Sequence, residues 1–244
     1  MSSRWGGRLK GVARSRGRRW SLAFLVAFIA ISLPLGRSEA AEASVPAGLD
    51  RVVVERLDRE TQQTMIGTTW SEGCPVALRD LRRVIVPFVD FSGATNRGML
   101  VVHRDVAAAV GRIFVSLYSS RFLIASIEPI EKFCGDDERS PMANNTSAFN
   151  CRPSFGADGA PTKRWSQHAY GRAVDVNPVQ NPYVLANGSV LDPAAKPFLD
   201  RRSGAPGMAV RGGAVVRAFA AEGWKWGGNW RSTKDYQHFS VTGR

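Results

Sequence analysis

Two of the three histidines stand in motifs whose residue types could bind a metal. His168 lies in the segment SQHAYGRAVD (166–175), and His238 lies in the segment DYQHF (235–239). A catalytic zinc site uses three nitrogen or oxygen ligands from the protein and keeps a fourth position open. His168, Asp175 and His238 would supply that set, and Asp235 is a further carboxylate that could accept a proton. The residue types alone are also compatible with a hydrogen-bonded histidine–aspartate pair that has no metal.

Regular secondary structure does not by itself bring these side chains together. His168 and Asp175 are seven residues apart, so a continuous strand would place them on opposite faces. We therefore expect His168 in a turn before Gly171 and Asp175 on the strand that follows. For the second motif we expect Asp235 in a loop and His238 at the start of the last strand. The tryptophans at 224, 226 and 230 are expected to wall the site and to fix the segment that bears Asp235.

Hydrophobic patterning predicts the elements that must position these residues. Alternating and β-branched runs predict strands, and apolar residues at helical spacing predict helices. We expect Asp105 to cap one helix and Gly223 to end another. Residues 130–165 show little periodicity and are expected to form a long functional loop. The mixed order predicts a small α+β domain with a central, largely antiparallel sheet flanked by helices. The predicted strands are 84–89, 99–102, 122–127, 170–176 and 236–241, and the predicted helices are 105–119 and 213–222.

The N-terminal segment has the order of a secretory signal. Residues 1–40 are basic, then apolar over 22–33, then small, which is typical of a signal peptide. The apolar run is short for a membrane span, which needs about 20 residues, although a retained anchor stays an alternative. We expect 41–75 to be a polar lead-in and 76–244 to be the catalytic domain.

The charge of the chain argues against nucleic-acid binding. Residues 1–40 hold eight Lys or Arg and one Glu, so they account for +7 of the formal net charge of +12 and leave +5 for the remainder. That balance is only mildly basic, and no basic stripe with interleaved aromatic residues occurs. We expect no nucleic-acid partner.

The three cysteines allow one disulfide. Export would permit it, and three thiols allow three different single pairings. Cys134 and Cys151 bracket the loop before the first motif, so this pair is favoured over one that includes Cys74. No C-x-x-C spacing occurs, so a cysteine zinc site is not expected.

Taken in order, the motifs resemble a known family. Ser-x-His-x-x-Gly-x-Ala-x-Asp, then Gly-Trp-x-Trp-Gly-Gly and Asp-x-x-His-Phe, are similar to those of the D-alanyl-D-alanine carboxypeptidase family of zinc peptidases. That family includes vancomycin-resistance carboxypeptidases and dipeptidases and phage L-alanyl-D-glutamate endopeptidases. The resemblance covers 84–244, with the sharp matches in 166–178 and 223–239.

The resemblance implies roles for individual residues. It implies that His168, Asp175 and His238 bind Zn²⁺ and that Asp235 is the general base. Ser166 occupies a position near the substrate. The family also uses a substrate-binding arginine upstream, for which Arg152 and Arg139 are candidates and Arg152 is favoured. An arginine fork suits a carboxylate or a developing oxyanion.

The implied function is that of an exported bacterial zinc metallopeptidase acting on peptidoglycan stem peptides. Trimming of a terminal D-alanine and cleavage inside the stem peptide, as by an L-alanyl-D-glutamate endopeptidase, both stay open. An inactive cell-wall-binding module is the alternative from another class, and a structural zinc domain is a weaker one. The expected location is secreted, cell-wall or periplasmic, with membrane contact only through an uncleaved N-terminal segment. The oligomeric state is not predicted.

Overall fold

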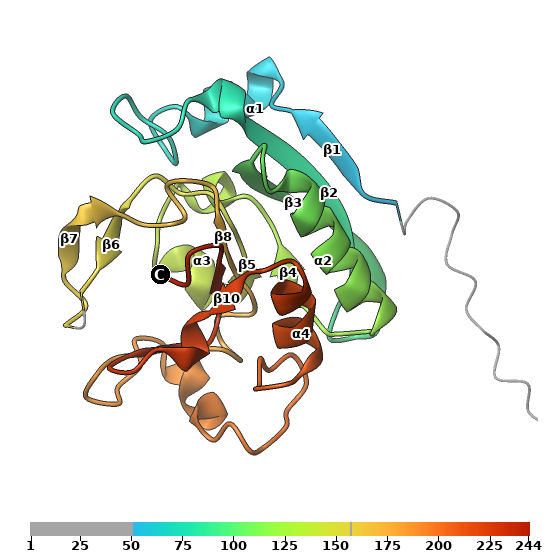
Figure 1. Cartoon of the computed structure of the whole chain (residues 1–244), viewed down its shortest axis with the longest axis vertical. Coiled ribbons are helices and arrows are strands. Elements are labelled where there is room, and N and C mark those ends of the chain that lie inside the picture. The colour runs from blue at the N-terminus through green and yellow to red at the C-terminus, as the bar shows by residue number, and fades with distance from the viewer. Residues whose placement is uncertain (1–50, 157) are drawn as a thin grey trace, which may run out of the picture. The chain divides into compact units, whose positions relative to one another are not determined.

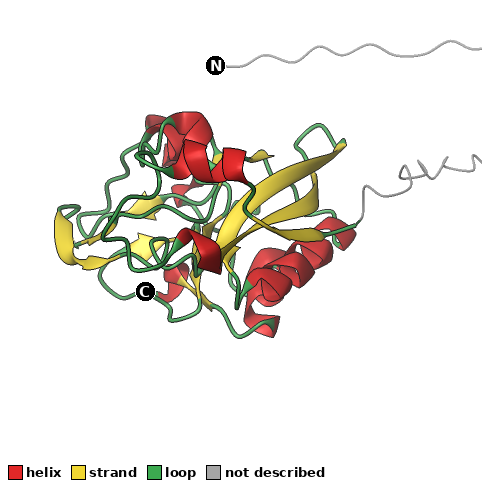
Figure 2. Cartoon of the chain, turned by 90° about the horizontal axis from the view of Figure 1, so that it is seen from above, coloured by secondary structure: helices red, strands yellow, loops and turns green. Residues whose placement is uncertain are grey.

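A long antiparallel ladder forms the larger sheet of the computed structural model, which describes residues 51–156 and 158–244. Strand β2 (Leu81–Val89) pairs along its full length with β3 (Thr95–His103), and β1 (Val53–Arg56) pairs with the other edge of β2. Helix α2 (Ala107–Ser119) lies along this ladder (Figures 1 and 2). The expected strands over 84–89 and 99–102 and the expected helix over 105–119 are confirmed.

A second, smaller sheet carries the two motifs. Its strand order is β10 (Lys225–Trp226), β12 (His238–Ser240) and β8 (Ala173–Asp175), all antiparallel. Helix α4 (Ala214–Ala221) leads into this sheet, and Gly223 follows it with a φ of +79°, a conformation that glycine adopts without a Cβ clash. The helix expected over 213–222 is therefore present and slightly shorter than predicted, whereas the strand expected over 236–241 is reduced to His238–Ser240.

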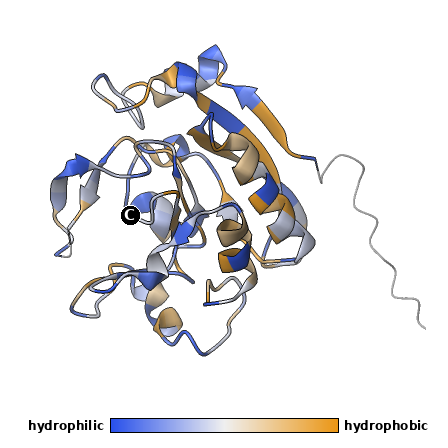
Figure 3. Ribbon diagram, viewed as in Figure 1, coloured by the Kyte–Doolittle hydropathy of each residue, from blue (hydrophilic) through white to orange (hydrophobic). Residues whose placement is uncertain are grey.

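One hydrophobic core joins the two sheets and both helices. Leu100 of β3 and Phe114 of α2 are almost fully buried in the same cluster as Phe219 of α4 and Phe239 of β12. The rings of Phe219 and Phe239 stack with centroids 4.1 Å apart. Hydrophobic residues are prominent on β2 and on both helices in Figure 3. The second sheet is thus anchored on the larger one, which gives the motif residues a rigid support.

The remaining elements are short and form connections around these two sheets. The expected α+β class is confirmed, with mostly antiparallel pairing spread over several small sheets. Strands β4 (Ser126–Ile127) and β5 (Asn145–Thr146) pair in parallel. No helix in 51–156 or 158–244 has the length and apolar character needed to cross a membrane. The expected signal segment, residues 1–40, lies outside the described residues. The short connecting helices and strands are α1 (Arg59–Met65), η1 (Leu78–Asp80), β4 (Ser126–Ile127), η2 (Ile130–Phe133), α3 (Arg139–Met142), β5 (Asn145–Thr146), β6 (Pro153–Phe155), β7 (Pro161–Trp165), β9 (Tyr183–Val184), η3 (Pro193–Leu199), η4 (Gly227–Asn229) and β11 (Lys234–Asp235).

Several local predictions were wrong. The residue that caps α2 is Val106, and Asp105 instead bonds to Arg172 and to His103. The strand expected over 122–127 is reduced to β4. The expected loop over 130–165 contains the β6–β7 hairpin, which was missed because its strands are short and begin with proline. The expected lead-in also contributes structure, since β1 and the buried Met65 of α1 lie within it.

The predicted Cys134–Cys151 disulfide was wrong, because Cys151 is bonded to Cys74, with 6.0 Å between their Cα atoms. The main-chain N–H of Cys151 donates to the carbonyl of Thr69, which brings the Cys74 segment alongside it. Cys134 is a free, exposed cysteine at the end of η2. Proximity in sequence therefore favoured the wrong partner.

We expect Cys74→Ser to lower the free energy of unfolding by about 2–4 kcal/mol, because the disulfide closes a loop between residues 77 positions apart. Urea unfolding of the non-reduced protein measures this change. Cys134→Ser is the matched control and should leave the midpoint unchanged. Equal destabilisation by both substitutions would contradict the observed pairing.

Candidate metal centre

The strand register places Asp175 and His238 side by side. Asp175 ends β8 and His238 begins β12, and their Cα atoms are direct partners in the antiparallel ladder. Directly opposed residues project from the same face of a sheet. Asp175 Oδ1 consequently lies 3.1 Å from His238 Nδ1. His238 begins its strand as expected.

A tight turn brings His168 to the same point. The turn before β8 is closed by hydrogen bonds from the N–H of Gly171 to the carbonyl of His168 and from the N–H of His103 to the carbonyl of Gly171. Gly171 has a φ of +64°, and a Cβ on it would lie 2.6 Å from the His103 nitrogen. Glycine is therefore required here, and the position of His168 in a turn is as predicted. The main chain of His103 bonds to this turn, and its imidazole bonds to Asp105.

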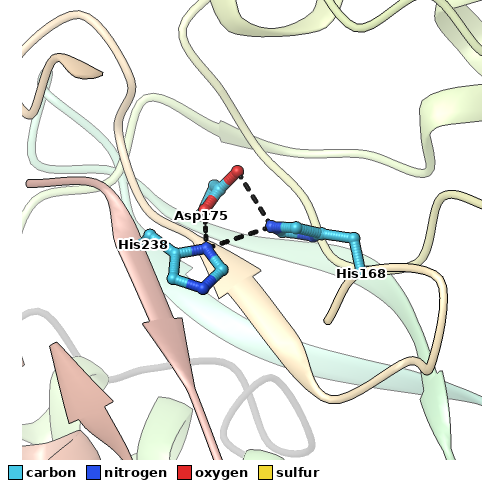
Figure 4. Close-up of side chains that lie close together, drawn as sticks. All are labelled: His168, Asp175 and His238. Atoms are coloured by element: carbon cyan, nitrogen blue, oxygen red, sulfur yellow. Dashed lines mark hydrogen bonds and ion pairs between the residues drawn. The ribbon is translucent and has the colours of Figure 1, made fainter. Parts of the chain in front are cut away.

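The three side chains form a triangle of possible metal ligands, with one ligand atom of each within 4.8 Å of the others (Figure 4). His168 Nε2 lies 3.1 Å from Asp175 Oδ2 and 3.2 Å from His238 Nδ1. Two ligands at about 2.0–2.1 Å from a tetrahedral zinc ion would lie roughly 3.3–3.4 Å apart. The contacts of His168 Nε2 are therefore close to the ligand–ligand distances around one zinc ion, and all three residues are buried.

Main-chain carbonyls orient both imidazoles. The outer nitrogen of His168, Nδ1, faces the carbonyl of Ala148, and the outer nitrogen of His238, Nε2, lies 3.1 Å from the main-chain oxygen of Arg244. Each outer nitrogen then carries the ring proton, which leaves lone pairs on the two inner nitrogens. Two lone pairs and a carboxylate facing one another repel unless a cation or an added proton lies between them. The donor set therefore fits a bound divalent metal.

The carboxylate of Asp175 and the two imidazoles shift one another's pKa values. Burial alone would raise the pKa of Asp175, but the charges and hydrogen bonds of His168 and His238 outweigh it and hold the pKa well below its usual range. Burial opposes a charge on His238, yet the bond to Asp175 raises its pKa overall. The pocket thus favours an ionised carboxylate facing positive charge.

Asp235 lies beside this triangle on β11. It was expected in a loop, but β11 pairs with β9 through Asp235 and Tyr183, so that prediction was wrong. Its Oδ1 atom is buried and has no hydrogen-bond partner among the described residues. Burial and the nearby charge of Asp175 raise the pKa of Asp235 to about 7, although His238 and Arg152 act in the opposite sense. A buried carboxylate of this kind is suited to accept and release a proton near neutral pH.

The glycine–tryptophan motif fixes the segment that carries Asp235. A Cβ on Gly227 would lie 2.6 Å from the Asp235 carbonyl, so only glycine permits this approach. The indole N–H of Trp226 donates to the carbonyl of Tyr236. Of the three tryptophans expected to wall the site, only Trp230 lines the cavity, with its ring centroid 5.6 Å from that of His238. Trp224 and Trp226 belong to the core.

Arg152 reaches the same cavity, whereas Arg139 does not line it. The guanidinium Nε of Arg152 lies 2.8 Å from Asp137 Oδ1, and the same oxygen accepts a hydrogen bond from the side-chain amide of Asn150 at 2.8 Å. Sequence reasoning missed Asp137 and Asn150, because no motif marks a residue that only orients another. The arrangement holds a cation near Asp235 without placing it on the metal ligands.

Ser166 is buried in the cavity wall. Its hydroxyl accepts from the His168 N–H at 3.3 Å, and its own N–H donates to the Arg152 carbonyl at 3.1 Å. It therefore connects the arginine segment to the metal turn. Its expected contact with substrate stays a prediction, as do the roles of Arg152 and Asp235.

These groups share one cavity of about 940 Å³. Its floor holds the metal triangle and Asp235, and its walls come from α3, the β6–β7 hairpin and the segment after β9. A cavity of this size exceeds the needs of a dipeptide and lies at the upper end of the range for small-molecule sites. It has room for several residues of a peptide.

The raised pKa of Asp235 predicts a pH dependence of stability. In the metal-free protein its carboxyl keeps a proton up to a pH of about 7, whereas the unfolded chain releases it near the ordinary value of 3.8. The folded state then binds more protons, so stability falls as pH rises through this window. We expect Asp235→Asn to melt at a higher temperature than the wild type at about pH 8, with a smaller difference at about pH 5. A difference independent of pH would contradict the assignment.

Comparison with known proteins identifies the segment that carries the centre. The model of a family described as D-alanyl-D-alanine carboxypeptidase matches residues 160–241. The match includes His168, Asp175, Asp235 and His238 and leaves Arg152 outside. No curated protein and no solved structure matches the chain significantly.

Proposed function

We propose that this chain, whose residues 160–241 match the model of the D-alanyl-D-alanine carboxypeptidase family, is a zinc peptidase that hydrolyses peptide bonds of bacterial peptidoglycan after export. The observation that carries the proposal is the cluster of His168, Asp175 and His238. His168 Nε2 and His238 Nδ1 lie close to each other and to the carboxylate of Asp175. The family match supports a carboxypeptidase-like hydrolase, and the donor set supports the metal.

Zinc is the metal that best fits two imidazoles and one carboxylate in a tetrahedral site with one open position. When bound, it supplies a Lewis acid that polarises the scissile carbonyl and lowers the pKa of the attacking water. His168 and His238 are held for this purpose by the carbonyls of Ala148 and Arg244. Their fixed orientation lowers the cost of arranging ligands when the ion binds.

Asp235 performs the proton transfers in the proposed reaction. It accepts a proton from the water as the water oxygen forms a bond to the peptide carbonyl carbon. It then returns that proton to the leaving amine as the carbon–nitrogen bond breaks. The buried, unpartnered Oδ1 atom is free to take part in both steps.

Arg152 is proposed to bind a substrate carboxylate or the developing oxyanion. Its Nε is held by Asp137, and its Nη1 bonds only to the adjacent carbonyl of Pro153, so the guanidinium retains donors for a ligand. Charge-assisted hydrogen bonds from a fixed arginine are the strong ones. This role would explain why Arg152 lies in the cavity although it stands outside the family match.

Export is supported by two features of the chain. The order of residues in 1–40 fits a signal peptide. The Cys74–Cys151 disulfide is of a kind that persists in oxidising compartments. These features support the proposal that the enzyme acts in the periplasm, at the cell wall or outside the cell.

Cleavage within the stem peptide is the second candidate, and the cavity of about 940 Å³ favours it because residues on both sides of the scissile bond would fit. Digestion of purified peptidoglycan, with products identified by mass spectrometry, separates the two candidates. Loss of a single terminal D-alanine would establish the carboxypeptidase. Release of larger stem-peptide fragments would establish the endopeptidase, and no product from the folded, zinc-loaded protein would refute both and favour a binding module.

A further inference from the structure

Large hydrophobic side chains gather around the mouth of the catalytic cavity. Met142, Phe155, Trp165 and Leu191 all line it, with exposed fractions of 52%, 45%, 40% and 68%. They come from α3, from both strands of the β6–β7 hairpin and from the segment after β9. Apolar area left in contact with water at a cleft is typical of a ligand-binding surface.

The two aromatic residues, Phe155 and Trp165, lie on the β6–β7 hairpin. We call this hairpin with its two rings the platform. Phe155 is opposite Pro161, and Trp165 is opposite Pro153, so the rings stand toward opposite ends of the hairpin ladder. Figure 1 shows this hairpin extending from the side of the domain. The hydroxyls of Ser154 and Thr162 lie 2.6 Å apart and tie its strands together.

Hydrogen-bonding groups accompany these rings. Thr162, Arg164 and Asp158 line the same cavity. The guanidinium carbon of Arg152 lies 5.0 Å from the centroid of the Phe155 ring, which fixes that ring by a cation–π contact. The platform therefore combines flat apolar faces with nearby donors and acceptors.

Trp165 is close along the chain to His168, a candidate metal ligand. It directly precedes Ser166 and stands three residues before His168, so their Cα atoms lie within about 10–11 Å. A group that rests on the indole therefore lies at the cavity that holds the candidate metal ligands. The platform belongs to the substrate path and is not a remote surface.

The chemistry of the platform suits a sugar better than the stem peptide itself. Stem peptides consist mainly of alanine, glutamate and a diamino acid, whose small or charged side chains would leave two aromatic rings mostly uncovered. A pyranose ring has an apolar C–H face that stacks on an aromatic ring and equatorial hydroxyls that bond to polar neighbours. We propose that Phe155 and Trp165 bind the saccharide to which the stem peptide is attached, an inference that rests on the proposed peptidase function. The enzyme then prefers glycan-linked stem peptides to free ones.

The test compares two substrates that differ only in the sugar. One is a disaccharide-pentapeptide, and the other is the N-lactyl pentapeptide, which keeps the amide at its N-terminus but lacks the sugar. The wild type should cleave the glycan-linked substrate with a kcat/KM at least about tenfold higher, a ratio that one good stacking contact can produce. Trp165→Ala and Phe155→Ala should each bring this ratio toward one, and Trp165→Phe should retain most of it.

Phe91→Ala provides the matched control, because Phe91 is similarly exposed at 42% and does not line the cavity. This variant should keep the wild-type ratio. Equal cleavage of both substrates by the wild type, or an unchanged ratio in Trp165→Ala, would overturn the sugar platform and leave the peptidase intact. Cleavage of neither substrate would refute the peptidase function, and the platform with it.

Discussion

Asp235→Asn should lower kcat by about 10²–10⁴-fold while the protein still binds one zinc ion. Asparagine has nearly the same shape as aspartate, but its amide cannot accept the proton of the attacking water. The buried Oδ1 atom of Asp235 has no hydrogen-bond partner among the described residues, so no other bond compensates for the loss of the base. Steady-state kinetics together with metal analysis of the same sample measures both quantities.

The matched control for this variant is Asp200→Asn, which changes the charge equally at an exposed position outside the cavity. Its kcat should stay within about twofold of the wild type, as expected for surface substitutions. A fully active Asp235→Asn enzyme would remove Asp235 from the mechanism. Loss of zinc along with activity would instead make it a ligand or a structural support.

His168→Ala should reduce bound zinc from about one ion per chain to near zero and abolish hydrolysis, because a catalytic site with three protein ligands has none in reserve. The substitution also leaves the Ala148 carbonyl without its imidazole partner. Zinc content after dialysis, measured by mass spectrometry of the metal, and the residual rate report the two effects.

His103→Ala is the control for removing a histidine. His103 lies 2.6 Å from Asp105 and holds the Gly171 turn through its main chain, so the side-chain change leaves that turn bond in place. This variant should keep its zinc. If His168→Ala bound zinc as the wild type does, the assignment of the three ligands would be wrong.

The cluster of candidate metal ligands could be found from the sequence because its residues stand in recognisable motifs. His168 and Asp175 stand in one ten-residue motif, and His238 starts a strand with a clear hydrophobic pattern. The requirement that His168 leave the strand followed from the seven-residue spacing, and the turn at Gly171 meets it. Spacing predicted the turn, whereas the choice of these three residues as ligands followed from the family resemblance.

Features that depend on distant parts of the chain were not predicted. Cys74 reaches Cys151 because the segment around Thr69 runs beside it, which no spacing reveals. Asp137 orients Arg152 from a separate turn. Asp105 favoured a helix cap by local rules, but Arg172 from the metal turn provides it with a stronger, charged partner. Tertiary contacts decided each of these cases.

The most direct test of a zinc peptidase centred on His168, Asp175 and His238 is hydrolysis of a purified stem peptide before chelation, after chelation and after zinc is restored. We predict full cleavage, then none, then recovery with about one zinc ion per chain. Asp175→Asn treated in the same way should not recover. Cleavage by the wild type that persists in the chelated, zinc-free protein would contradict the account.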